Sequence, residues 1–119
     1  MIKSEKEVRT MARHEFGIMD TAPQHGERYD AYEPEKYGCI SVDDEWIEQL
    51  DKRVAQMDCF WHTIDCKGKG LAYCGVTLIP PDSLGELLKA VKEQEELHDL
   101  RQILEQAKRE MKFVIHFGL

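Results

Sequence analysis

Three residues have side chains suited to nucleophilic or acid–base chemistry, namely His62, Cys74 and His116. A histidine close to a cysteine can take the thiol proton and so produce the thiolate, which is the reactive form of the side chain. His62 and Cys74 belong to the two halves of one predicted β-hairpin, but they are not directly opposite each other in it. These residues are therefore candidates for catalysis, and their spacing assigns no reaction to them.

The spacing of Cys59, His62 and Cys66 is close to that of zinc ligands. Side chains alternate between the two faces of an extended strand, however, so residues 59 and 62 point to opposite faces. We therefore expect no metal site in this segment.

A second motif involves Tyr32 and Lys36, which match the Tyr-x-x-x-Lys pair of short-chain dehydrogenases. Pro34 lies between them and disfavours the helical turn that this pair requires. The G-x-G-x-x-G fingerprint of dinucleotide-binding proteins is also absent. We expect neither an NAD-dependent dehydrogenase nor any other cofactor.

The composition limits the class of protein. The chain has 119 residues and a formal net charge of −7, with 16 basic residues scattered among 23 acidic ones. Phosphate binding depends on clustered Lys and Arg, so we expect no nucleic-acid partner and favour a basic protein partner, with homo-oligomerisation left open. The length predicts a single domain over residues 11–119, preceded by a flexible arm over residues 1–10.

No run of about 18 apolar residues and no apolar signal-peptide core is present, which predicts a cytoplasmic protein without a membrane span. In that reducing compartment, the four cysteines are expected to be free and mostly buried.

Residues 59–79 are expected to form a β-hairpin with residues 68–70 at its tip. A three-residue tip places Phe60 opposite Leu78 and keeps the apolar side chains of both strands on one face, whereas a two-residue tip would mix the faces. His62 falls on that apolar face, where a histidine is usually neutral and hydrogen-bonded.

The opposite face of the hairpin carries Trp61 and Tyr73 beside Asp65. Large aromatic side chains on the less apolar side of a sheet are typical of a recognition surface. As an alternative, the long polar segment over residues 20–36 or the N-terminal segment covers these rings and forms a second small core with them. Acidic residues at the start of a helix predicted before the hairpin extend the candidate binding surface, unless they only cap that helix; they are Asp43, Asp44 and Glu45.

Capping boxes that begin at Ser41 and Ser83 predict two helices, and an apolar stripe over residues 97–111 predicts a third. A last strand alternates over residues 113–117, with His116 expected to face away from the main core. The predicted fold class is α+β, in two layers, with an antiparallel or mixed sheet of about four strands covered by about three helices.

The chain over residues 11–119 resembles a family of small bacterial proteins, in the segments MARHEFGIM, ERYDAYEPEKY, ISVDD, GLAYCGVTLIPPDSL and KFVIHFG. That resemblance implies no activity, substrate or catalytic residue. The segment GLAYCGVTLIPPDSL with the amphipathic helix after it is also similar to segments of immunity proteins in bacterial polymorphic toxin systems. Those proteins are small, acidic, cytosolic and α+β, so the similarity implies a protein that binds another protein.

We therefore expect a small acidic binding protein without catalysis, immunity-like or regulatory, in which acidic groups steer a basic partner and Trp61 and Tyr73 anchor it. The alternative is a small-molecule-binding domain or an enzyme, with a pocket between the sheet and the 20–36 loop that uses His62, Cys74 or Tyr73. A flat or convex acidic surface around Trp61 favours the first hypothesis, and a concave pocket that contains a perturbed titratable group favours the second.

Overall fold

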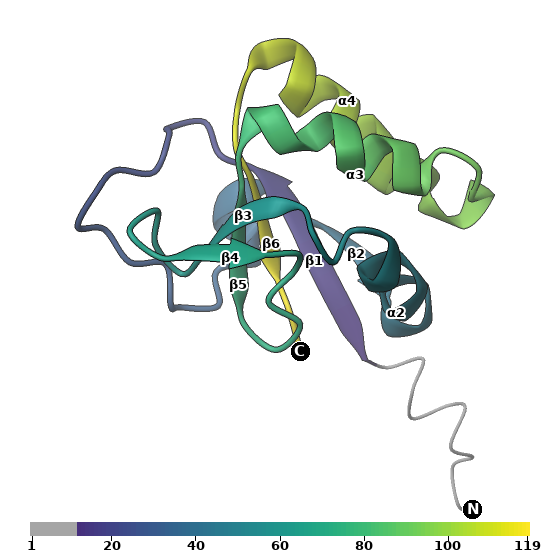
Figure 1. The fold of residues 1–119 in the computed structure, drawn as a ribbon, viewed down its shortest axis with the longest axis horizontal. Helices are drawn as coiled ribbons and strands as arrows, with labels where there is room; N and C mark the ends of the chain where they lie inside the picture. Colours follow the sequence, from purple (N-terminus) through teal and green to yellow (C-terminus); the bar gives the residue numbers. More distant parts are fainter. Residues whose placement is uncertain (1–11) are drawn as a thin grey trace, which may run out of the picture.

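The structure, a computed structural model, describes residues 12–119 (Figure 1). The arm predicted over residues 1–10 lies outside the described residues. The elements, in chain order, are β1 (Arg13–Ile18), η1 (Pro34–Tyr37), β2 (Ile40–Asp43), α2 (Asp44–Arg53), β3 (Asp58–Trp61), β4 (Lys67–Lys69), β5 (Val76–Ile79), η2 (Pro81–Ser83), α3 (Leu84–Val91), η3 (Glu95–Leu97), α4 (His98–Glu110) and β6 (Val114–Phe117). No helix within residues 12–119 is long and apolar enough to cross a membrane.

The strands form one six-stranded sheet in the order β2-β1-β6-β5-β3-β4, and every neighbouring pair is antiparallel. The α+β class, the antiparallel sheet and the three α-helices are confirmed, but the expected number of about four strands is wrong. One strand that the sequence does not reveal is β4, because Lys-Gly-Lys has no apolar alternation. Two lysines are typical of a short edge strand, which must resist pairing with other chains.

The predicted pairing of the hairpin strands is present, but its predicted tip is wrong. Phe60 pairs with Leu78, as the apolar pattern requires. The segment between the two strands is not a tight turn, because β4 pairs along the other edge of β3, with Cys59 opposite Gly68. The apolar pattern therefore determines the register, while the path of the connection depends on backbone hydrogen bonds that the pattern does not encode.

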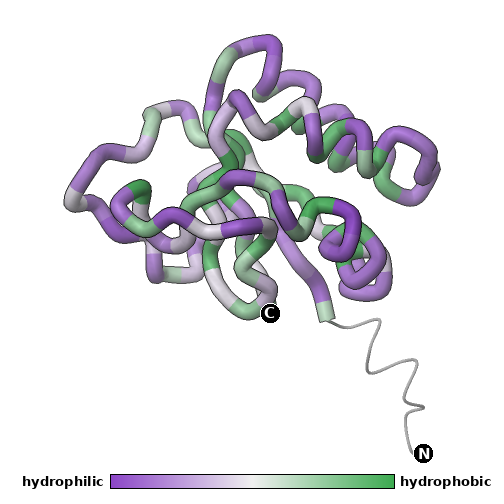
Figure 2. The backbone as a smooth tube through the Cα atoms, viewed as in Figure 1, coloured by the Kyte–Doolittle hydropathy of each residue, from purple (hydrophilic) through white to green (hydrophobic). Residues whose placement is uncertain are grey.

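The main core lies between the three α-helices and one face of the sheet (Figures 1 and 2). The helices bury apolar side chains at intervals of three and four residues, as predicted; they include Ile47, Leu50, Leu84, Leu87, Val91, Leu100, Leu104 and Ala107. Each of the Ile, Leu and Val side chains among them contributes about 1.5–3 kcal/mol when it is fully removed from water. Met111 was expected in the same stripe, but it is exposed because it ends α4 in the left-handed conformation, with φ of 57°.

The other face of the sheet is covered by residues 19–39, the β1–β2 loop (Figure 1). Met19, Tyr29 and Tyr37 of this loop pack on a second cluster formed by Val76, Leu78, Ile115 and Phe117. A second small core under the loop is one of the two arrangements that the sequence leaves open. The residues beneath the loop are not Trp61 and Tyr73, however, since Tyr73 packs against the main core.

The alternation predicted for the last strand is present in β6, but the expected orientation of His116 is wrong. Ile115 and Phe117 face the β1–β2 loop, whereas Val114 and His116 lie on the side of the helices. His116 is fully buried there. Both faces of this sheet are apolar, so periodicity identifies two faces without showing which one the helices cover.

Neither predicted capping box forms. The helix α2 begins at Asp44 after an Asp43 that makes no side-chain cap, and Ser41 is part of β2. The hydroxyl of Ser83 does not cap α3 but donates to the carbonyl of Asp58 at 2.6 Å. Ser83 thus fixes the start of α3 to β3.

Candidate functional site

A surface pocket of about 420 Å³ lies between the sheet and the β1–β2 loop. This volume is within the range that accommodates small organic ligands. Its lining comes from five separate parts of the chain: Arg13; Asp30 and Tyr32; His62; Cys74, Gly75 and Val76 at the β4–β5 turn and the start of β5; and Phe117, Gly118 and Leu119 at the end of β6. The structure therefore brings His62 and Cys74 to one pocket.

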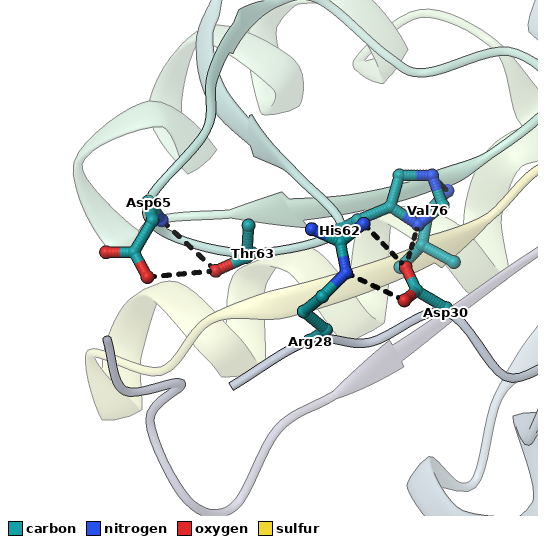
Figure 3. Close-up of polar contacts among 6 residues, drawn as sticks. All are labelled: Arg28, Asp30, His62, Thr63, Asp65 and Val76. Carbon is teal, nitrogen blue, oxygen red and sulfur yellow. Dashed lines mark hydrogen bonds and ion pairs between the residues drawn. The ribbon is translucent and has the colours of Figure 1, made fainter. Parts of the chain in front are cut away.

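His62 is paired with Asp30 at the wall of this pocket (Figure 3). The Nδ1 atom of His62 lies 2.8 Å from Oδ1 of Asp30, although the N–H is not aligned as a hydrogen bond. Arg28 donates to the same carboxylate, from Nε at 2.8 Å and from Nη2 at 3.2 Å. The hydrogen bond and the charge of Arg28 lower the pKa of Asp30, so this carboxylate stays ionised beside the imidazole.

The ionised carboxylate selects the tautomer of His62. A proton on Nδ1 is favoured by Asp30, which leaves Nε2 as the acceptor. The backbone N–H of Val76 lies 3.4 Å from this Nε2 (Figure 3). In its neutral form, an imidazole with this tautomer takes up a proton at Nε2.

The backbone at His62 is also unusual. Its φ is 63°, in the left-handed region that few residues other than Gly adopt, although Asn, Asp and His adopt it more often than most. Two backbone hydrogen bonds hold it: its N–H donates to the Val76 carbonyl at 2.9 Å, and its carbonyl accepts from the Tyr29 N–H at 2.7 Å. Strained residues that their surroundings hold in place cluster at functional sites. The expectation of a core histidine is wrong, because His62 lies beyond the end of β3 with its side chain 33% exposed.

Gly75 allows the imidazole to come close to the β4–β5 turn. A Cβ atom at this position would lie 2.7 Å from Nε2 of His62. Real Cβ contacts are longer than this, so a side chain at residue 75 would displace the imidazole. Cys74 is the preceding residue, and its thiol is free and exposed.

The four thiols differ in their surroundings. None is in a disulfide, as predicted, but only Cys59 is fully buried; Cys39 is half-buried, and Cys66 and Cys74 are exposed. Burial raises the pKa of both Cys39 and Cys59 to about 12. These two side chains therefore stay protonated and unreactive at neutral pH.

The third candidate, His116, lies in a different place. It belongs to a buried polar chain in which its Nε2 is 2.9 Å from Nδ1 of His14 and its Nδ1 is 3.1 Å from Oγ1 of Thr77. Nε2 of His14 is in turn 2.8 Å from Oδ1 of Asp44, which also accepts a hydrogen bond from the Tyr73 hydroxyl. Both imidazoles are fully buried, so a substrate cannot reach them.

This buried chain has a structural role. Burial, reinforced by His14, lowers the pKa of His116 to about 3, so His116 is neutral. Thr77 can then donate to Nδ1 of His116, Nε2–H of His116 to His14, and His14 to Asp44, so every ring nitrogen has a hydrogen-bond partner. This series of hydrogen-bonded side chains joins β1, β5, β6 and the start of α2.

The sequence does not predict the roles of His14, which lies between His116 and Asp44, and Asp30, which pairs with His62. His14 alternates with Phe16 in β1, which is compatible with burial but does not distinguish a buried histidine from an exposed one. Asp30 lies in a polar loop without periodicity, and only the path of that loop brings it to His62.

The acidic part of the predicted binding surface is not one exposed patch. Asp44 is buried, and Asp43 is half-buried with a carboxylate oxygen 3.4 Å from Nη2 of Arg13. Glu45 is exposed. Burial and the hydrogen bond to Asp44 raise the pKa of Tyr73, and its ring packs on His14.

The other part of that surface lies at the far side of the sheet, because β1, β6 and β5 separate β2 from β3. The indole of Trp61 lies over Gly68 and donates from Nε1 to the Gly70 carbonyl at 3.1 Å. Asp65 is bonded to His25 and to the N–H of Gly26. The predicted surface residues are thus divided between two separate regions.

Within residues 12–119, no group of three His, Cys, Asp or Glu side chains is placed to hold a metal ion. No protein-family model, curated protein or solved structure matches the chain, so a function has to be inferred from the chemistry of the pocket.

Proposed function

We propose that the protein binds a small organic acid in the pocket between the sheet and the β1–β2 loop. The observation that carries this proposal is the pairing of His62 with Asp30 at the wall of a concave pocket, where His62 holds a strained backbone conformation. Convergent polar groups in an otherwise apolar hollow are typical of a ligand site.

The chemistry of the lining supports an acid as the ligand. Val76, Phe117 and Leu119 provide apolar contacts for a short carbon skeleton. Arg13 supplies a guanidinium group, whose planar set of N–H donors matches a carboxylate, and its side chain is 52% exposed. His62 is the second group that can donate to such a ligand.

Binding of a basic protein has less support than the pocket. The acidic and aromatic residues expected to serve it are divided between two regions, which leaves the net charge of −7 as the main argument for it. The pocket, in contrast, contains titratable groups that their surroundings perturb. Besides the lowered pKa of Asp30, a hydrogen bond to Glu15 together with burial raises the pKa of Tyr32 to about 12.

Thermal melting with a panel of small mono- and dicarboxylic acids at millimolar concentration tests the proposal. A ligand present at about 100 times its Kd stabilises the folded protein by about 2.7 kcal/mol, which raises the Tm by several degrees. We expect one or more acids to do so with the unmodified protein, and His62→Asn to abolish the increase. Asn is the preferred replacement because it tolerates the left-handed backbone.

A matched control is His25→Asn. His25 is also paired with an aspartate, Asp65, and lies on the same loop, but it does not line the pocket. It should leave the increase in Tm unchanged. If no acid raises the Tm, or if the increase survives in His62→Asn, the proposal is wrong.

A further inference from the structure

Cys74 differs from the other thiols in its neighbours. Among the four cysteines, it is the one that lines the pocket with His62. Cys66 is equally free and exposed, but it does not line this pocket. The chain thus contains two exposed thiols, of which one shares a hollow with an ordered imidazole.

The turn that carries Cys74 is firmly held. The N–H of Gly75 donates to the Ala72 carbonyl at 3.0 Å, and the N–H of Leu119 donates to the Tyr73 carbonyl at 3.0 Å. The N–H of Ala72 donates to Oγ1 of Thr77 at 2.8 Å, which connects the turn to the buried histidine chain. Cys74 is therefore presented by a rigid segment, as an accurately placed nucleophile must be.

His62 approaches the same turn with its Nε2, which accepts the N–H of Val76 at 3.4 Å and would have to release it in order to take a proton from the thiol. Its Nε2 lies against the backbone of residues 75 and 76, directly beside Cys74 in the chain. Its other nitrogen, Nδ1, is next to the ionised Asp30. A thiol, an imidazole and a carboxylate that orders the imidazole are the three parts of a nucleophile–base arrangement.

Groups that can stabilise negative charge are also present. The backbone N–H of Cys74 makes no hydrogen bond to any residue of the described part of the chain, so it remains available as a donor. Arg13 contributes a positive charge to the same pocket. Backbone N–H groups and guanidinium groups are the kinds of donor that stabilise an oxyanion.

We propose that Cys74 is the nucleophile of an acyl-transfer reaction, with His62 as its general base. The inference rests on the proposed function, since the acyl donor is an activated ester or thioester of the small acid that the pocket binds. His62 takes the thiol proton, and the sulfur attacks the acyl carbon. The new C–S bond replaces the bond to the leaving group, which accepts the proton from His62. Water then attacks the thioester with His62 again as base, which releases the acid and restores the thiol.

The rate of alkylation by iodoacetamide tests the pairing of Cys74 with His62 without any knowledge of the natural substrate. Peptide mass spectrometry follows Cys74 and Cys66 separately in the same sample at pH 7. We expect Cys74 to react at least about ten-fold faster than Cys66, because a general base in the same pocket can take the thiol proton as the sulfur attacks the reagent. His62→Asn should bring Cys74 to within about two-fold of Cys66 and leave the rate of Cys66 unchanged.

Two further variants keep this test decisive. Asp30→Asn alters an exposed carboxylate and should also slow Cys74 by several-fold, whereas His25→Asn should slow neither thiol. Equal rates for Cys74 and Cys66 in the unmodified protein, or a fast Cys74 in His62→Asn, would overturn the assignment.

An acyl probe tests the reaction itself. With p-nitrophenyl acetate, we expect a burst of one equivalent of p-nitrophenolate and an acetyl group on Cys74, both lost in Cys74→Ser. Acetylation shared equally between Cys74 and Cys66 would overturn the proposal. The proposed function and this inference fail separately. If a carboxylic acid binds but Cys74 is unreactive, the binding pocket stands and the role of Cys74 as a nucleophile is wrong. If Cys74 is reactive but no acid binds, only the proposed class of ligand is wrong.

Discussion

His116 shows how one buried side chain can make the stability of the protein depend on pH. In the folded state its pKa is about 3, because burial and the adjacent His14 oppose protonation. In the unfolded chain the same side chain has its ordinary pKa of about 6.5. Below pH 6.5 the unfolded state therefore binds a proton that the folded state excludes, and stability decreases as the pH falls towards 3.

We expect the free energy of unfolding to fall between pH 6.5 and 4.5, by up to about 1.4 kcal/mol per pH unit from His116. His116→Phe removes the titrating group, so its pH dependence should be shallower, although the variant is less stable at pH 7.5 by about 1–3 kcal/mol because His14 and Thr77 lose a partner. Urea unfolding of both proteins at pH 6.5 and pH 4.5 measures this difference. An equal loss of unfolding free energy between these two pH values in both proteins would contradict it.

At the scale of the elements, the end of β6 and the β4–β5 turn are packed at backbone distance. A Cβ atom added to Gly118 would lie 2.1 Å from the carbonyl oxygen of Tyr73. The obstacle is backbone rather than a flexible side chain, so the two segments would have to separate. Glycine at this position thus allows the turn that carries Cys74 to dock against the sheet.

Gly118→Ala is expected to destabilise the protein by about 1–3 kcal/mol, because the overlap forces a backbone shift. Gly85→Ala serves as a control in α3, where the nearest atom to the new methyl is Nζ of Lys108 at 3.6 Å. Alanine is the better helix former by about 1 kcal/mol, so this control should be neutral or stabilising. Thermal or urea unfolding of the two variants gives the comparison, and equal losses of stability would contradict the packing argument.

The sequence predicts elements with apolar periodicity better than elements without it. The buried stripes of the three helices and the pairing of Phe60 with Leu78 follow from spacing alone. The strand β4 cannot be predicted in this way, because its residues form backbone hydrogen bonds at the edge of the sheet and bury no apolar side chain in a core. The hydroxyl of Ser83 fits a capping motif equally well, yet the nearby carbonyl of Asp58 is the acceptor that it finds.

For the molecule as a whole, the sheet has an apolar core on each face. The helices cover one face and the β1–β2 loop covers the other (Figure 1). The pocket exists only because this loop is held against the sheet. His62 and Cys74 are recognisable in the sequence because their residue types suggest chemistry, but Asp30 and Arg13 join them only through the paths that the loop and β1 take in space.

Tyr29 is expected to hold the β1–β2 loop in place. Its ring packs in the second core and its N–H donates to His62, whereas Tyr32 on the same loop is 64% exposed. Tyr29→Ala should therefore cost about 1–3 kcal/mol and accelerate amide hydrogen exchange in the loop, with little change in α4. Tyr32→Ala should have a much smaller effect on exchange, and an equal effect would show that the loop is held by something other than the Tyr29 ring.

The central position of β1 and β6 in the sheet has a consequence for how the protein reaches its fold. These neighbouring strands contain His14 and His116, which are 102 residues apart in the chain. Bringing such distant segments together costs loop-closure entropy before their pairing can stabilise the fold. Proteins dominated by contacts of this kind fold in milliseconds to seconds rather than microseconds. Until β1 and β6 meet, β6 keeps an open edge with the apolar sequence Val-Ile-His-Phe. Refolding at high protein concentration should then lose material to aggregation at that edge.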